Sequence, residues 1–236
     1  IVFGDWSSDV CSSDLGLAET PGSVDGLGSA ARFIYPSGIA TDGTNLYVAD
    51  YDNHAIRKIL ISNGDVTTVA GLLGTFGSAD GGAAARFNNP WGIVLDGTNL
   101  YVADSGNSTI RKIDTSTGDT TTIAGSAGET GSADGIGAAA TFYYPCGITM
   151  VGGNLYVADT DSNTIRRVDP ATGAVTTVAG DPLEYGHADA AGSAARFWSP
   201  KGITTDGTDL YVADTGNHII RKIVLSTAAV TTVAGL

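Results

Sequence analysis

One motif of seventeen residues occurs four times in this chain of 236 residues, and it constrains the fold more than any other feature. The sequence GTNLYVADYDNHAIRKI at 43–59 returns with few changes at 97–113, 152–168 and 207–223. The motif arginines are 54, 55 and 55 residues apart, at Arg57, Arg111, Arg166 and Arg221. A fixed period of this size predicts a repeat architecture, in which each supersecondary unit packs on the next copy.

Within one repeat, four short segments have the pattern of β-strands. Residues 100–104 (LYVAD) are β-branched and aromatic, residues 109–113 (TIRKI) and 120–125 (TTTIAG) alternate, and the apolar run 92–94 (GIV) follows a proline. The turn sequences DGTN and STGD separate these segments. We therefore predict an all-β fold, a β-propeller of four-stranded antiparallel blades. The four expected blades span about 16–71, 72–125, 126–180 and 181–235.

A connecting segment precedes each predicted blade and ends in a phenylalanine. Each segment contains a run of small residues, such as GSAAR before Phe33. We expect this run to form one helical turn and the phenylalanine to fill the seam between neighbouring blades. The four phenylalanines are Phe33, Phe87, Phe142 and Phe197.

Taken together, the elements P-x-G-I, N-L-Y-V-A-D, N-(H)-x-I-R-K-I and G-x-V-T-T-V-A-G resemble the NHL repeat. The resemblance covers essentially all of residues 16–235. The Asn-His pair of the family is present as Asn53-His54 and Asn217-His218, and is replaced in the other two copies. The resemblance implies a β-propeller, and related domains most often have six blades. We therefore expect these four blades to be an arc of a larger ring.

The first fifteen residues fit none of the repeats. Residues 5–15 (DWSSDVCSSDL) read as the translation of a common short-read sequencing adapter, and repeat sequence resumes at Gly16. We interpret residues 1–15 as a non-native, adapter-derived segment of a metagenomic fragment, and residues 16–236 as the propeller. On this interpretation the native amino terminus and any signal peptide lie outside the chain, and no disulfide joins Cys11 to Cys146.

Acidic residues that recur in every repeat are expected to build the frame. One set ends the YVAD sequence seven residues before each arginine, and it can accept turn amides or pair with that arginine: Asp50, Asp104, Asp159 and Asp214. A second set occupies the Asp-Gly loops, at Asp25, Asp80, Asp134 and Asp189. A calcium site would need several oxygen ligands to converge, whereas each loop offers one aspartate. We predict tight turns there, no metal site and no cofactor, with calcium as the open alternative.

The positions that vary against the repeated frame are the candidates for function. They flank the proline that begins each innermost strand, where the loops are expected to ring one mouth of the propeller channel. Exposed aromatic side chains there suit contact with sugars or peptides, although packing between blades is the alternative for some of them. The predicted ligand-binding residues are Tyr35, Trp91, Tyr143, Tyr144, Trp198 and Lys201.

The regular repetition favours a non-enzymatic binding or scaffold module for a protein, peptide or carbohydrate ligand over an enzyme. The alternatives are a metal-dependent propeller enzyme of the lactonase or lyase type, and the propeller domain of a larger enzyme whose other domain is missing. The 12 basic and 25 acidic residues give a formal charge of −13, which disfavours nucleic acid binding. No apolar stretch is long enough for membrane insertion. The acidic, Thr- and Gly-rich composition suits a secreted or cell-surface bacterial protein, and open blade edges offer a route to oligomerisation.

Overall fold

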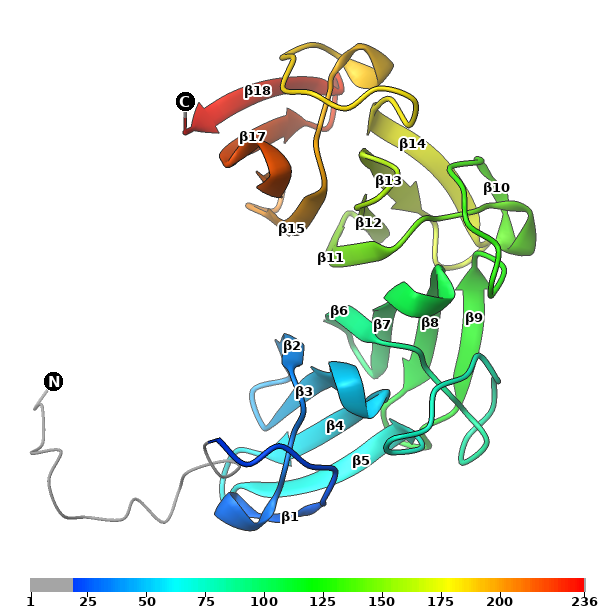
Figure 1. Ribbon diagram of the computed structural model, residues 1–236, viewed down its shortest axis with the longest axis vertical. Coiled ribbons are helices and arrows are strands. Elements are labelled where there is room, and N and C mark those ends of the chain that lie inside the picture. Colours follow the sequence, from blue (N-terminus) through cyan, green and yellow to red (C-terminus); the bar gives the residue numbers. More distant parts are fainter. Residues whose placement is uncertain (1–18, 236) are drawn as a thin grey trace, which may run out of the picture.

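The chain folds into four antiparallel β-sheets arranged as an open arc (Figure 1). This computed structural model describes residues 19–235. The segment 1–15, interpreted above as adapter-derived, lies outside the described residues. The predicted all-β propeller architecture is confirmed, and the first and last blades stay apart at the two ends of the arc.

In every blade, four strands run in sequence order from the concave side of the arc to its convex side. The first blade contains β2 (Pro36–Thr41), β3 (Asn45–Asp50), β4 (Ala55–Leu60) and β5 (Asp65–Gly71). The second contains β6 (Pro90–Asp96), β7 (Asn99–Asp104), β8 (Thr109–Asp114) and β9 (Thr120–Ala124). The third contains β11 (Pro145–Val151), β12 (Asn154–Asp159), β13 (Thr164–Val168) and β14 (Ala174–Gly180). The fourth contains β15 (Pro200–Thr205), β16 (Leu210–Asp214), β17 (Ile219–Val224) and β18 (Ala229–Ala234).

The connecting segments lie along the outer edge of the blade that follows them. Two of them add a short fifth strand there, β1 (Gly26–Leu27) on β5 and β10 (Gly135–Ile136) on β14. The expected helical turn is present as a 3₁₀ turn in three connecting segments: η1 (Gly28–Ala30), η4 (Gly137–Ala139) and η5 (Gly192–Ala194). The second segment forms a hydrogen-bonded turn instead, in which the Ala85 N–H donates to the Gly82 carbonyl.

The hydrophobic core lies in the seams between blades. Phe87 is fully buried in a cluster that joins Ile56 of the first blade to Leu100 of the second. Phe142 and Phe197 occupy the next two seams in the same way. Each seam is therefore one shared apolar layer, as expected from the position of the phenylalanines.

The innermost strands of neighbouring blades approach each other closely where the sequence has Pro-x-Gly. A Cβ atom at Gly92 would lie 2.3 Å from the Cys146 carbonyl oxygen, and one at Gly147 would lie 2.3 Å from the Lys201 carbonyl oxygen. Only glycine leaves room for this contact. The glycines consequently bring the residues just before them, which vary between repeats, close together around the axis.

Both ends of the arc leave a seam-type face without a covering blade among the described residues. Ile220 has 40% of its surface exposed, whereas its repeat equivalents Ile110 and Ile165 are fully buried. At the other end Ile39 is 61% exposed and Phe33 is only partly buried. These two faces correspond to the two sides of an internal seam.

No helix within residues 19–235 has the length and apolar character needed to span a membrane.

Candidate ligand-binding site at the mouth of the arc

A buried ion pair in each blade holds the loops that form the mouth. In the second blade, Asp104 and Arg111 are both fully buried and their Oδ2 and Nη1 atoms lie 2.7 Å apart. The guanidinium also lies over the Phe87 ring, 4.9 Å from its centre. The other blades repeat the pair: Asp50 with Arg57, Asp159 with Arg166, and Asp214 with Arg221.

The aspartates of the Asp-Gly loops clamp the other side of each arginine. Asp80 Oδ1 lies 2.8 Å from Arg111 Nη2 and also accepts the Thr122 hydroxyl proton, while its Oδ2 accepts the Thr122 N–H. Asp25, Asp134 and Asp189 make the same contacts in their own blades. The carboxylates considered for calcium therefore fasten each connecting segment to its outer strand. Within residues 19–235, no group of three acidic, histidine or cysteine side chains is placed to hold a metal ion.

The inner carboxylates also position the loop before each proline. Asp104 Oδ1 accepts the N–H of Asn88, two residues before Pro90, at 2.8 Å. The N–H groups of Ile34, Tyr143 and Trp198 donate to the equivalent aspartates. The next residue then adopts a left-handed backbone with φ between 46° and 53°, at Tyr35, Asn89, Tyr144 and Ser199. This conformation is energetically costly for a tyrosine. The hydrogen bonds of the preceding residues to the aspartates therefore keep Tyr35 and Tyr144 at the mouth in a backbone conformation that tyrosine rarely adopts.

The polar residue at the end of the motif links one blade to the next. His54 Nδ1 accepts the N–H of Asn89 across the first seam at 3.1 Å. Burial lowers the pKa of His54, which favours the neutral ring that this acceptor role requires. Asn163 makes the equivalent link in the third seam, where its Oδ1 accepts the Ser199 N–H. The Asn-His pair is thus part of the frame.

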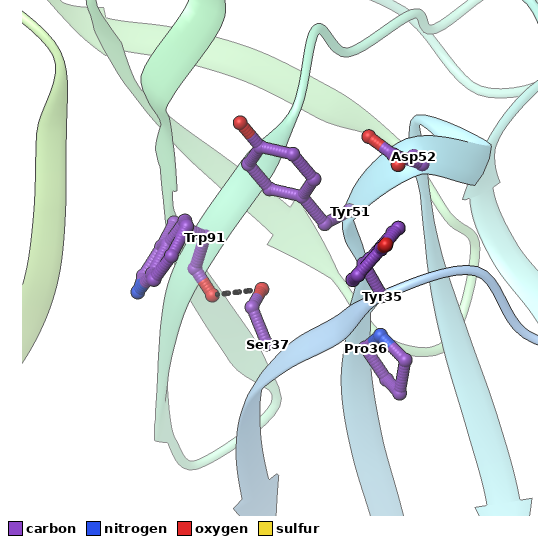
Figure 2. A pocket seen from close by; sticks show the side chains of 6 residues that line it. All are labelled: Tyr35, Pro36, Ser37, Tyr51, Asp52 and Trp91. Atoms are coloured by element: carbon purple, nitrogen blue, oxygen red, sulfur yellow. Dashed lines mark hydrogen bonds between the residues drawn. The ribbon is translucent and has the colours of Figure 1, made fainter.

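A pocket of about 380 Å³ opens on the concave side between the first two blades (Figure 2). Its volume is within the range of small-molecule sites. A hydrogen bond from the Ser37 hydroxyl to the Trp91 carbonyl oxygen, 2.9 Å long, joins the two blades beside it. Its walls are mostly apolar and come from Tyr35, Pro36, Ser37, Tyr51, Asp52 and Trp91.

Side chains from the third and fourth blades reach this pocket's walls from across the axis. The Tyr144 hydroxyl is hydrogen bonded to the Tyr51 hydroxyl. The Lys201 ammonium nitrogen lies over the Trp91 ring, 5.7 Å from its centre. Burial, supported by the contact with Tyr51, raises the pKa of Tyr144, so the Tyr144 phenol stays protonated at neutral pH. All four blades therefore contribute to one cluster.

Two of the predicted residues lie outside this cluster. Tyr143 and Trp198 are 47% and 46% exposed, and Trp198 packs against Tyr185 with ring centres 5.4 Å apart. Their backbone N–H groups bind the frame aspartates, and neither residue lines the pocket. The other four predicted residues, Tyr35, Trp91, Tyr144 and Lys201, meet at the mouth.

Four of the six residues that line the pocket are not among the predicted ligand-binding residues: Pro36 and Ser37, which directly follow Tyr35, and Tyr51 and Asp52. Tyr51 and Asp52 directly follow the YVAD sequence of the first blade, in the 3₁₀ turn η2 (Tyr51–Asn53). The corresponding pairs in the other blades are Ser-Gly, Thr-Asp and Thr-Gly, so these positions also vary against the frame. The same criterion, applied one loop further along the chain, finds them.

The cluster carries both signs of charge. Asp52 accepts an amide proton from Asn89 through Oδ1 at 3.1 Å. Burial raises the pKa of Asp161, while the Lys201 charge opposes that shift.

Cys146 is buried, and burial raises the pKa of its thiol. Its side chain is therefore a packed residue and a weak nucleophile.

The fold defines a class, the β-propeller, and in this chain variable side chains from all four blades form a cluster at the axis. The sequence model of the NHL repeat matches residues 33–59 and 87–113. Human NHL repeat-containing protein 2 is 32% identical over 91% of this chain. The chain belongs to the NHL-repeat proteins. It spans about a third (34%) of the length of that relative.

Solved structures share the fold. An auxiliary nutrient binding protein from Bacteroides ovatus superposes with a TM-score of 0.65 at 24% identity, over 86% of this chain and 50% of its own. A streptogramin B lyase superposes with a TM-score of 0.57 at 12% identity, over 84% of this chain and 53% of its own. At these identities the likeness shows the fold alone. One fold thus serves both a binding protein and an enzyme, so function depends on the site.

Proposed function

We propose that this chain is a non-enzymatic binding module that holds a ligand at the axial mouth. The observation that carries the proposal is the convergence of one side chain from each blade on a single cluster. Tyr51, Trp91, Tyr144 and Lys201 come from the first to the fourth blade in that order. Variable residues gathered on one face of a repeat protein are the usual place for a binding site.

The composition of the cluster fits recognition better than frame building. The buried aspartates and arginines already stabilise each blade, so the mouth residues are free to vary. The large Tyr35 side chain is 76% exposed, and its backbone is in the costly left-handed conformation. This residue therefore contributes little to the stability of the fold. Exposed aromatic walls beside a few charged groups suit a peptide, protein or glycan surface.

Direct binding measurements test the proposal. The chain is screened against an array of soluble oligosaccharides and a library of tetrapeptides. We expect at least one probe to bind, with binding lost in Trp91→Leu and retained in the matched variant Trp198→Leu, which lies outside the pocket. Thermal melting checks that both variants are folded. Equal loss in both variants, or no loss in Trp91→Leu, would contradict a site at the mouth.

A further inference from the structure

The pocket between the first two blades has the chemistry of an aromatic cage. Building on the proposed function of the mouth, we propose that this pocket binds a trimethylammonium group, as carried by choline-type compounds or by a trimethylated lysine side chain. The structure places three aromatic residues around one cavity with a single carboxylate, and this combination is the one that recognises quaternary ammonium ions.

The aromatic walls stand at an angle that encloses a rounded cation. The Tyr51 and Trp91 rings have centres 5.3 Å apart and planes 87° apart, so they form two adjoining walls. Tyr35 faces the same cavity from the loop before β2 (Figure 2). A ring presents its negative electrostatic face to a cation within about 6 Å of its centre. A methylated ammonium fits this space because its charge is spread over an apolar surface.

The charge of the lining favours a cation. Asp52 is its one charged residue, and the lining contains no basic side chain. Asp52 Oδ1 accepts the Asn89 amide proton, and no hydrogen bond to its Oδ2 atom is present among the described residues. A carboxylate at the edge of a mostly apolar pocket stabilises a positive charge without filling the pocket.

The small number of polar groups argues for the methylated cation over its competitors. A primary ammonium needs three acceptors, and a sugar needs several donors and acceptors. Apart from the hydroxyl at the tip of Tyr35, the polar groups of the lining side chains are few: the Asp52 carboxylate, the Ser37 hydroxyl, whose proton is given to the Trp91 carbonyl oxygen, and the Tyr51 hydroxyl, which is hydrogen bonded to Tyr144. A trimethylammonium group has no N–H to satisfy, so burying it there leaves no donor without a partner.

The same Trp91 ring already attracts a cation within the molecule. The Lys201 ammonium lies 5.7 Å from its centre, although Lys201 does not line the pocket. The four motif arginines also lie over phenylalanine rings, at 4.9 to 5.2 Å. Contacts between a positive charge and an aromatic ring thus recur in this fold. The rings of the pocket can make the same contact with a cationic ligand.

Calorimetric titration of the full chain with choline tests the inference, with 3,3-dimethyl-1-butanol as the neutral compound of the same shape. We expect choline to bind at least about tenfold more tightly than the neutral compound. Asp52→Asn should weaken choline binding and leave the neutral compound unaffected. Trp91→Leu should abolish binding, while Trp198→Leu should preserve it. A third titration, with Nα-acetyl-trimethyllysine amide, distinguishes the two sources: the tighter of the two cationic probes identifies whether the pocket serves a free compound or a modified side chain.

Equal affinity for choline and its neutral counterpart would overturn the inference, as would choline binding that Asp52→Asn and Trp91→Leu leave unchanged. Asp52→Asn removes a charge without removing volume, so it stays informative if Trp91→Leu fails to fold. If neither choline nor Nα-acetyl-trimethyllysine amide binds but an oligosaccharide or tetrapeptide binds in a Trp91-dependent way, the inference fails and the proposed function stands. If no probe binds, both fail.

Discussion

The Lys201 ammonium nitrogen lies 5.7 Å from the centre of the Trp91 ring, although a whole blade separates the two residues in the chain. Trp91 belongs to β6 and Lys201 to β15. The contact exists because the arc turns the start of each innermost strand toward a common axis (Figure 1). A side chain that varies between repeats can therefore meet another one two blades away.

Removal of the Lys201 charge should change ligand affinity more than stability. Lys201→Met keeps the aliphatic stem and loses the ammonium, so we expect the free energy of unfolding to fall by less than about 1 kcal/mol. Because a positive charge leaves the mouth, choline should bind more tightly. The control is Lys222→Met, since the Lys222 ammonium also lies 5.7 Å from a ring centre, that of Tyr211. Weaker choline binding in Lys201→Met alone would contradict the electrostatic picture of the mouth.

Loss of one partner of a frame ion pair should be severely destabilising. Asp104 accepts hydrogen bonds from Asn88, Asn107 and Arg111 in a fully buried position. Asp104→Asn leaves the Arg111 charge without this partner, and we expect it to lower the free energy of unfolding by about 3–5 kcal/mol. Urea unfolding measures the change. Asp119→Asn, at an exposed position, is the control and should cost less than about 0.5 kcal/mol. Similar costs for both would refute the structural role of the pair.

Because the last blade is uncovered at the end of the arc, the same substitution at one repeated position should destabilise the fold less there than in an internal blade. Ile165 is fully buried in a seam, whereas Ile220 is 40% exposed in the last blade. We expect Ile165→Ala to lower the free energy of unfolding by about 2–4 kcal/mol and Ile220→Ala by less than about 1 kcal/mol. Equal costs, measured by urea unfolding of the same chain, would indicate that a further surface covers Ile220 in solution.

The frame could be predicted from the sequence because it depends on local patterns that return four times. Asp104, Arg111 and Phe87 recur at fixed spacing, and a hairpin blade brings them together whatever lies beside it. The position of Tyr35, Trp91 and Lys201 near the axis followed from the same repetition, because each flanks the proline of an innermost strand.

The contacts between those residues could not be predicted, for a geometric reason. Whether Tyr144 reaches Tyr51 depends on the rotation summed over two blades, and no local pattern in the sequence encodes that rotation. Trp198 lies outside the pocket, where its N–H donates to Asp214 and its ring packs on Tyr185. The sequence shows an aromatic residue there but gives no sign of its partner.

The hydrogen bond between Tyr144 and Tyr51 predicts an alkaline effect. The pKa of Tyr144 is raised in the folded chain by burial, so this phenol keeps its proton while the unfolded chain loses it near pH 10. Both states are protonated below that pH, and above it the unfolded state gains stability. The free energy of unfolding should therefore decline above pH 10, and less steeply in Tyr144→Phe. Tyr143→Phe, outside the cluster, should decline like the unsubstituted chain. An identical decline in all three would contradict the assignment.

The central claim is that ligands bind at the mouth beside Trp91, and the indole N–H resonances of Trp91 and Trp198 test it directly. Trp91→Phe and Trp198→Phe assign the two signals in a ¹⁵N-labelled chain. The chain is then titrated with choline and with members of the oligosaccharide and tetrapeptide sets. We predict that at least one probe shifts the Trp91 signal in a saturable way while the Trp198 signal stays in place. Shifts confined to Trp198, or a Trp91 signal that no probe moves, would contradict the claim.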